Sequence, residues 1–75
     1  MQLSYKLLLH KEADDNYTVV VPALPGCVTY GKDIDEAISM AKEAIELYIE
    51  ELQSRNEPIP DESNTLEYSL NIATA

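Results

Sequence analysis

The chain has 75 residues, 45% of them hydrophobic and 25% charged, which is the composition of a small folded domain rather than of a disordered segment. Fourteen acidic residues against five basic ones give a net charge of −9, and such a surface repels nucleic-acid phosphates, which bind through lysine and arginine. One cysteine excludes an internal disulfide, and no apolar run approaches the ~20 residues of a membrane span, so we expect a single cytoplasmic domain over residues 1–75.

Residues 3–10 (LSYKLLLH) predict the first strand, because every second side chain from position 3 is apolar. The side chains expected to face the core are Leu3, Tyr5, Leu7 and Leu9. The polar run 12–16 predicts a turn, and the β-branched run 17–22 predicts a second strand, paired antiparallel with the first. Pro22 ends that strand or places it at a sheet edge, because proline has no N–H for the ladder.

The stretch 24–27 (LPGC) fits a type II turn, in which Pro25 presets φ and Gly26 supplies the positive φ that the third position needs. Residues 27–30 then predict a short third strand, which stops at Gly31. The residues to which we assign a structural role in this connection are Pro25, Gly26, Cys27 and Gly31.

Cys27 is the only cysteine, and three interpretations are open for it: a small buried core residue, a reactive thiol, or a site of oxidation. A cysteine nucleophile needs a base within hydrogen-bond reach, normally a histidine. The only histidine is His10, near the end of the first predicted strand, and no sequence feature places it beside Cys27. We favour a core cysteine and a solvated His10, with a partner contact or a general base as alternatives for His10, and we expect no catalytic residue and no enzymatic activity.

From residue 33 the apolar period lengthens from two to between three and four, which predicts a helix of ~22 residues. Its apolar stripe consists of Ile34, Ala37, Ile38, Ala41, Ile45, Tyr48, Ile49 and Leu52. Asp33 is placed to cap the first free amides, and Glu36 three residues later completes a capping-box-like pair. At the other end, Glu51 and Arg55 are spaced to form an ion pair, and Asn56 is the expected C-cap.

Residues 66–72 (LEYSLNI) alternate again and predict a last strand after the proline-containing loop 58–65. Its inward side chains are expected to be Leu66, Tyr68, Leu70 and Ile72. The element order is then β-β-β-α-β. We therefore expect an α+β fold of two layers, with one long helix on one face of a mostly antiparallel sheet.

Three residues on the flank of the predicted helix lie off its apolar stripe: Met40, Ala44 and Leu47. Scattered surface apolar residues are common, so one interpretation is a loosely packed margin of the core. The alternative is a self-association surface, which suits a domain too short to bury much area alone. Homo-oligomers, dimers or tetramers, are therefore expected for this chain.

Ten of the fourteen acidic residues fall within residues 33–62, which contain only Lys42 and Arg55 as bases. One interpretation is a well-solvated helix face, and the other is a docking surface for a basic protein. The residues selected for docking are Asp35, Glu43, Glu46 and Glu50. Carboxylates spread along a solvent-facing helix diverge, whereas a metal ion needs converging ligands within ~2.0–2.6 Å, so we expect no metal and no cofactor.

The order of these features resembles a known family. An aromatic-led strand that ends in proline is followed by LPGC at 24–27, by Gly31, by the helix DEAISMAKEAIELYIEEL at 35–52, and by PIP at 58–60. Over residues 3–61 this combination resembles the HicB family of type II toxin–antitoxin systems. Lys32-Asp33 stands where the family often has Asp-Thr or Asp-Ser, and Asp33 still supplies the helix cap.

The resemblance implies a partial ribonuclease-H-like fold without the catalytic carboxylates of that fold. It also implies an antitoxin that binds and blocks HicA, a small basic toxin that cleaves mRNA and itself supplies the catalytic histidine. Family members commonly assemble into dimers or higher oligomers. Many also carry a C-terminal DNA-binding domain, and none is expected within these 75 residues.

Two alternatives to a toxin-neutralising domain stay open. The first is a solitary oligomeric HicB-like domain with a scaffolding role or an unknown ligand. The second is a residual metal-dependent nuclease that uses the ribonuclease-H-like scaffold. The acidic balance favours a basic protein partner independently of the resemblance, because complementary potentials speed encounter and fix orientation.

Overall fold

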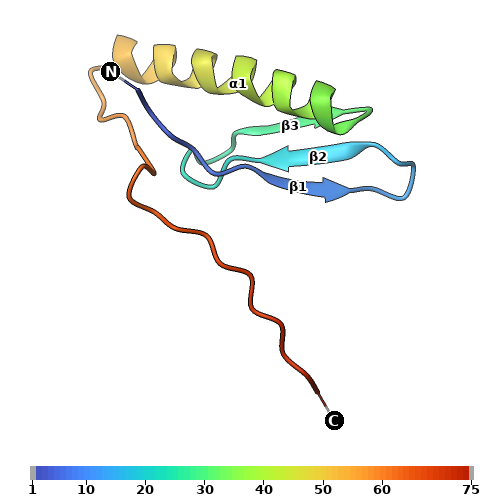
Figure 1. Ribbon diagram of the computed structural model, residues 1–75. Helices are drawn as coiled ribbons and strands as arrows, with labels where there is room; N and C mark the ends of the chain where they lie inside the picture. The colour runs from blue at the N-terminus through green and yellow to red at the C-terminus, as the bar shows by residue number, and fades with distance from the viewer. Residues whose placement is uncertain (1, 75) are drawn as a thin grey trace.

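Three antiparallel strands and one helix form two layers in the structure, a computed structural model that describes residues 2–74 (Figure 1). The elements are β1 (Leu8–Lys11), β2 (Tyr17–Val20), β3 (Val28–Gly31) and α1 (Ile34–Ser54). The strands lie in the order β1-β2-β3, and α1 packs on one face of the sheet, over β2 and β3. The predicted α+β architecture with one long helix on one face is confirmed.

The core lies between α1 and the central strand. Val19 pairs with Leu9 on one side and with Thr29 on the other, so these three side chains share the face that carries the helix. Two small groups of buried side chains fill the space: Val19, Ala37 and Ala41 near the start of α1, and Val21, Leu24 and Cys27 further along it. Small helix residues above the sheet let the two layers approach closely.

The turn at 24–27 has the predicted geometry. The Cys27 amide donates to the Leu24 carbonyl at 2.9 Å, and Gly26 has φ 80°, as the third position of a type II turn requires. The amide of Val21 donates to the Cys27 carbonyl at 3.0 Å, which closes the connection just beyond β2 and β3. This loop therefore buries Leu24 and Cys27 under the helix rather than exposing them.

Both ends of α1 are capped by the chain itself. Asp33 accepts a hydrogen bond from the Glu36 amide at 2.8 Å, and the Glu36 carboxylate accepts one from the Lys32 amide at 3.0 Å. At the other end the C-cap is Arg55, one residue earlier than predicted, because Asn56 takes the left-handed conformation with φ 55°. The amides of residues 56 and 57 then close onto the last free carbonyls of the helix, as in a Schellman motif.

The cap gives a first testable prediction. Asp33→Ala is expected to lower the free energy of unfolding by about 1 kcal/mol, because the Glu36 amide then loses its acceptor. Urea unfolding followed by circular dichroism measures the change. The control is Ser39→Ala, on the exposed face of the same helix, where no loss is expected. Equal stability of Asp33→Ala and the wild type would contradict the capping role.

The structure corrects two expectations about the strands. Residues 66–72, predicted as a last strand, form an extended tail that pairs with no other segment among residues 2–74 (Figure 1). The first strand is shorter than predicted, since residues 3–7 run alongside the helix outside the sheet. Alternating apolar residues are compatible with an extended segment that has one apolar side. A stable strand also needs a neighbouring strand to pair with, and the sequence pattern does not show whether one is present.

The loop before the tail is fastened to the N-terminal segment. The Ser4 amide donates to the Asp61 carboxylate at 2.8 Å, the Glu62 amide donates to the Ser4 carbonyl at 2.8 Å, and the Glu62 carboxylate accepts from the Lys6 amide at 2.8 Å. The Tyr5 hydroxyl donates to the Pro60 carbonyl. Burial, and then the negative charges of Asp61 and Glu62, raise the pKa of Tyr5 and keep that donor protonated. We call residues 4–6 and 60–62 together the clip.

The clip gives a pH prediction. The Ser4 amide, followed by the Ser63 hydroxyl, holds the pKa of Asp61 below its ordinary value, because both stabilise the carboxylate. Because this pKa is lowered, the Asp61 carboxylate makes its full contribution to the free energy of unfolding above about pH 3.9, the ordinary pKa. That contribution is lost as the pH falls through the pKa of the folded protein. The NMR shift of the Ser4 amide is expected to titrate with a midpoint below about 3.9. Asp61→Asn should abolish this step, and a midpoint at or above the ordinary value would contradict the assignment.

Candidate protein-binding surfaces

Four acidic side chains lie along the side of α1 that faces away from the sheet. Asp35, Glu43, Glu46 and Glu50 are all exposed or half-exposed, and at 100° per residue they fall within about 80° of one another on the helix. They cover about 22 Å of the helix axis. Ala37 and Ala41 mark the opposite, buried side. We call this set of four residues the acidic face; the structure brings them together on one rigid element.

No ion pair among residues 2–74 neutralises the charge of the acidic face. Among residues 2–74 the structure contains three salt bridges. They join Lys11 to Asp15 at 3.6 Å, Lys32 to Glu36 at 3.9 Å, and Arg55 to Glu51 at 2.7 Å. The last of these is the predicted pair. None of the three includes a residue of the acidic face, so its negative potential extends into solvent and can attract a basic partner.

The predicted self-association residues divide between surface and core. Met40 and Leu47 are exposed, at 43% and 65%. Ala44 is half-buried instead and packs against the cluster of Val21, Leu24 and Cys27. It lies about 60° from Ala41 around the helix, which is close enough for the turn at 24–27 to cover it. Of the three predicted residues, only Met40 and Leu47 are therefore exposed enough to contact a second copy.

Cys27 and His10 lie on different sides of the sheet. Cys27 is buried beside Leu24, and this burial raises the pKa of its thiol. His10 is exposed on the face away from the helix, since it follows Leu9 in β1 and successive side chains alternate. The structure thus gives Cys27 no base and favours its protonated form, which supports a packing role. Within residues 2–74 no three histidine, cysteine, aspartate or glutamate side chains are grouped so that they could hold a metal ion.

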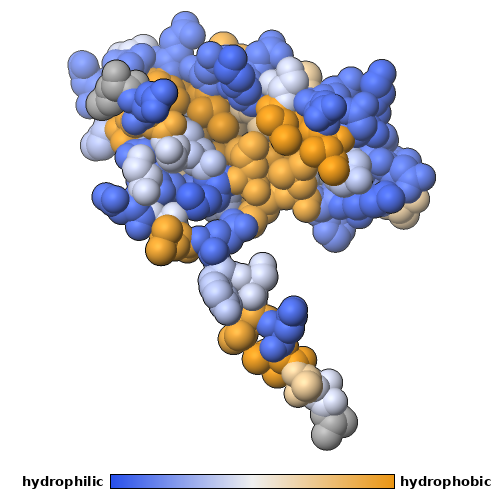
Figure 2. All heavy atoms as spheres, in the orientation of Figure 1, coloured by the Kyte–Doolittle hydropathy of each residue, from blue (hydrophilic) through white to orange (hydrophobic). Residues whose placement is uncertain are grey.

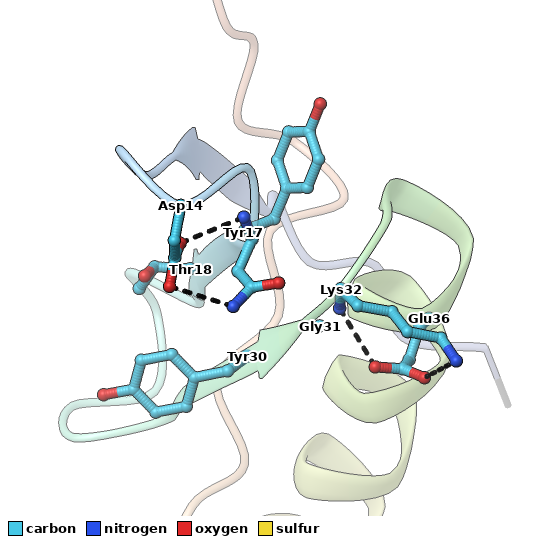
Figure 3. A pocket seen from close by; sticks show the side chains of 8 residues that line it. Asp14, Tyr17, Thr18, Tyr30, Gly31, Lys32 and Glu36 are labelled. Carbon is cyan, nitrogen blue, oxygen red and sulfur yellow. Dashed lines mark hydrogen bonds and ion pairs between the residues drawn. The ribbon is translucent and has the colours of Figure 1, made fainter.

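A shallow polar cleft lies where the β1–β2 turn meets the start of α1 (Figure 3). Its side chains bond mainly to one another: Asp14 accepts from the amide and the side chain of Asn16 at 3.1 and 3.0 Å, and Lys32 pairs with Glu36. Tyr30 lines the same cleft and is largely exposed. These bonds hold the β1–β2 turn and the start of α1 in place.

The face of the sheet away from α1 carries apolar side chains that were not predicted to form a surface. Leu8, Val20 and Val28 form one row across the three strands, and all three are exposed. Figure 2 shows a hydrophobic area over the region of the strands, bordered by hydrophilic side chains. The sequence could have predicted this apolar surface from the unbroken runs LLL at 7–9 and VVV at 19–21. Apolar side chains on consecutive strand residues point to both faces of a sheet.

Comparison with known proteins identifies the domain. Residues 5–73 match the sequence model of a family described as HicB-like antitoxin of bacterial toxin–antitoxin systems. The chain belongs to the HicB-like antitoxin family. The resemblance drawn from the LPGC turn, Gly31 and the helix is therefore confirmed, and the match extends past the helix into the tail at 66–72.

Relatives of this HicB-like chain occur in archaea and bacteria. A UPF0150 protein of Thermoplasma acidophilum is 50% identical over 58 residues, which cover 77% of this chain and 84% of that protein. A UPF0150 protein of Synechocystis is 46% identical over 59 residues, covering 79% and 75%. The crystal structure of the N-terminal domain of the Burkholderia pseudomallei antitoxin HicB superposes with a TM-score of 0.68 at 29% identity, over 91% of this chain and 72% of that one.

The helix described within residues 2–74 does not combine the length and the apolar character that a membrane crossing needs. The domain exposes the acidic face on α1 and an apolar row of side chains on the far face of the sheet. Surfaces of both kinds are suited to contacts with proteins.

Proposed function

We propose that this HicB-like chain binds and neutralises a small basic toxin of the HicA type by covering the toxin's RNA-binding or catalytic surface. The observation that carries the proposal is the acidic face: four carboxylates on one side of α1, none of them in an ion pair with the rest of the described chain. A surface that binds RNA must be basic, so a protein that blocks it gains from being acidic.

The helix is well suited to hold these charges in place. Its first turn is capped by Asp33, its last turn is closed by the left-handed Asn56, and its buried side is fixed on β2 and β3. Carboxylates on a rigid element keep their spacing, so little ordering is needed when a partner arrives. Charges at the rim of an interface mainly raise the association rate and fix orientation.

The proposed role needs no chemistry from this chain. Its thiol is buried, its histidine is on the far side of the sheet, and inhibition follows from occupying the toxin's surface. Cleavage of mRNA takes place in the cytoplasm, so the proposal places the complex there.

The first experiment is co-expression with a small basic protein from the same operon as this chain, and the absence of any such neighbouring gene would contradict the proposal. We expect co-purification of the two proteins, and we expect this chain to restore the growth of cells that express the toxin. A toxin that is not bound, and whose growth arrest is not relieved, would contradict the proposal.

The acidic face itself is tested with a matched pair of triple variants. Glu43→Gln/Glu46→Gln/Glu50→Gln removes three charges from the face, and we expect the association rate with the toxin to fall by about tenfold or more at low salt. The control Glu12→Gln/Asp15→Asn/Glu57→Gln removes the same number of charges from exposed sites off the face. Equal rates for the two variants would mean that net charge, rather than this face, determines encounter.

A further inference from the structure

An apolar groove lies open between α1 and residues 3–7. It has a volume of about 370 Å³, which falls within the range of small-molecule sites in proteins. Its lining combines six apolar side chains with two charged ones, Lys42 and Glu46. The apolar walls are Leu3, Tyr5, Leu7, Ile38, Ile45 and Ile49. A concave apolar surface with a few polar groups at its margin is the usual form of a ligand site.

The groove exists because of the way the helix lies on the sheet. α1 packs over β2 and β3, so the β1 side of its apolar stripe stays uncovered. Ile38, which was expected in the core, is 44% exposed for this reason. Figure 2 shows hydrophobic side chains between the helix and the strands on this side of the molecule. A ligand in the groove would remove several of these side chains from water together.

The clip holds the wall formed by residues 3–7 in place. The amides of Ser4 and Lys6 donate to the carboxylates of Asp61 and Glu62, both at 2.8 Å. The Tyr5 hydroxyl donates to the Pro60 carbonyl, so this polar group of the wall already has a partner. The groove is therefore formed by the chain alone, and little ordering of its walls is needed when a ligand binds.

Lys42 supplies a positive charge at the margin of the groove. Residues 33–62 contain one other base, Arg55, which is paired with Glu51. None of the three salt bridges among residues 2–74 includes Lys42. Its ammonium group is therefore available for a carboxylate from outside the chain.

The helical period places Lys42 closer to the apolar walls than Glu46. At 100° per residue, Lys42 lies about 20–60° around α1 from the three isoleucines of the groove, and Glu46 lies about 60–100° from them. A head group that leaves the groove beside the isoleucines therefore meets the ammonium before the carboxylate. Glu46 disfavours a head group with a second negative charge, because like charges repel.

The net charge of the chain does not exclude an anionic ligand. At physiological ionic strength, screening limits the field of the fourteen acidic residues to about 8 Å. A carboxylate on Lys42 is in direct contact with the ammonium, and charge-assisted hydrogen bonds of this kind are among the stronger ones in proteins. The local charge at the margin therefore decides which head group the groove accepts.

We propose that the groove binds a monocarboxylate with a medium-length alkyl chain, such as a fatty acid. The carboxylate accepts hydrogen bonds from the Lys42 ammonium, and the alkyl chain lies against the isoleucines of α1 and the wall at residues 3–7. From Lys42 to Ile49 the groove extends about 10 Å along the helix axis, which suits a chain of medium length. The proposal does not rest on toxin binding.

Titration of the full chain with sodium decanoate, below its micelle concentration and at physiological salt, tests the site. We expect saturable binding by calorimetry and shifts in the NMR signals of the Ile38, Ile45 and Ile49 methyl groups. Decyltrimethylammonium, with an alkyl chain of the same length and a positive head group, should bind about fivefold more weakly or worse. No saturable binding of decanoate would overturn the proposal. Equal or tighter binding of the ammonium compound would also overturn it, because the groove would then suit a basic partner.

Two charge variants should change decanoate binding in opposite directions. Lys42→Met is expected to weaken it about two- to fivefold, and Glu46→Gln to tighten it, because the first removes the attracting charge and the second a repelling one. The control is Lys32→Met, which removes the same charge from a residue that pairs with Glu36 outside the groove. Equal losses in Lys42→Met and Lys32→Met would overturn the assignment of the head group.

The apolar wall is tested with two side chains of the same helix that are equally exposed. Ile38, in the groove, is 44% exposed, and Met40, outside it, is 43% exposed. Ile38→Asn should weaken decanoate binding about fivefold or more, whereas Met40→Asn should leave it unchanged. Circular dichroism verifies that both variants are folded. Equal losses would overturn the proposal. So would NMR cross-relaxation, in the ligand-free protein, between these isoleucines and residues 66–72, because the groove would then already be covered.

Discussion

Replacing Leu24 by alanine is expected to lower the free energy of unfolding by about 2–5 kcal/mol. Leu24 is the largest fully buried side chain, with 0% exposure, and it packs with Val21 and Cys27. Tyr5, Leu7, Ala44, Ile45 and Tyr48 surround this cluster. Hydrogen bonds also hold the backbone of Leu24 in place. Its amide donates to the Val21 carbonyl at 3.0 Å, and its carbonyl accepts from the Cys27 amide at 2.9 Å. The site therefore has little freedom to close the cavity that the substitution would leave.

The expected loss is large for a chain of this length. A domain of this size has a total stability of about 4–11 kcal/mol, so Leu24→Ala removes a major share of it. Urea unfolding at one fixed protein concentration measures the change, because self-association would make apparent stability concentration-dependent. Leu47→Ala is the matched control: the same substitution at a side chain that is 65% exposed should change stability by less than about 0.5 kcal/mol. Losses of similar size would show that Leu24 does not anchor the core.

The features predicted correctly from the sequence are those that neighbouring residues determine. The type II turn depends on Pro25 and Gly26 alone. The helix start depends on Asp33, whose carboxylate accepts a hydrogen bond from the Glu36 amide three residues later. The acidic face was predictable for the same reason, since the helical period places Glu43, Glu46 and Glu50 on one side whatever the rest of the chain does.

The features that were wrong depend on which element lies beside which. Ile38 belongs to the apolar stripe by period, yet it is exposed because α1 covers β2 and β3 and not β1. Ala44 was predicted on the flank, yet the loop at 24–27 folds over it. The tail has a strand's alternation without a partner among residues 2–74 of its own chain. Sequence periodicity assigns sides to an element, but only the tertiary arrangement decides which side is covered.

Sequence patterns did not predict the clip, nor the apolar groove that lies between residues 3–7 and α1. The clip joins residues 4–6 to residues 60–62, more than fifty positions apart, through backbone amides whose bonding capacity nearly every residue shares. The groove combines Leu3, Tyr5 and Leu7 with three isoleucines of the helix. No short motif encodes either arrangement. The clip determines where the tail at 66–72 leaves the domain, and the groove leaves part of the apolar stripe of α1 uncovered.

Gly31→Ala is expected to lower the free energy of unfolding by about 3 kcal/mol or more, because the new methyl group has no room. A Cβ at position 31 would lie 2.3 Å from the Ala37 nitrogen, 2.6 Å from its Cα and 2.9 Å from its Cβ. These are mostly backbone atoms of the first turn of α1, and the Ala37 amide is bonded to the Asp33 carbonyl at 2.9 Å. The methyl group therefore forces the end of β3 away from the start of the helix.

The other glycine separates this steric effect from backbone conformation. Gly26 has φ 80°, and a methyl group added there would have no atom within 4 Å, so Gly26→Ala meets only the left-handed strain of about 1–2 kcal/mol. Asparagine tolerates that conformation, so Gly26→Asn should recover part of the loss, whereas Gly31→Asn should be at least as damaging as Gly31→Ala. Urea unfolding of the four variants measures this pattern. Recovery at position 31 instead of position 26 would mean that β3 and α1 are free to separate, and that their close contact is not what holds the two layers together.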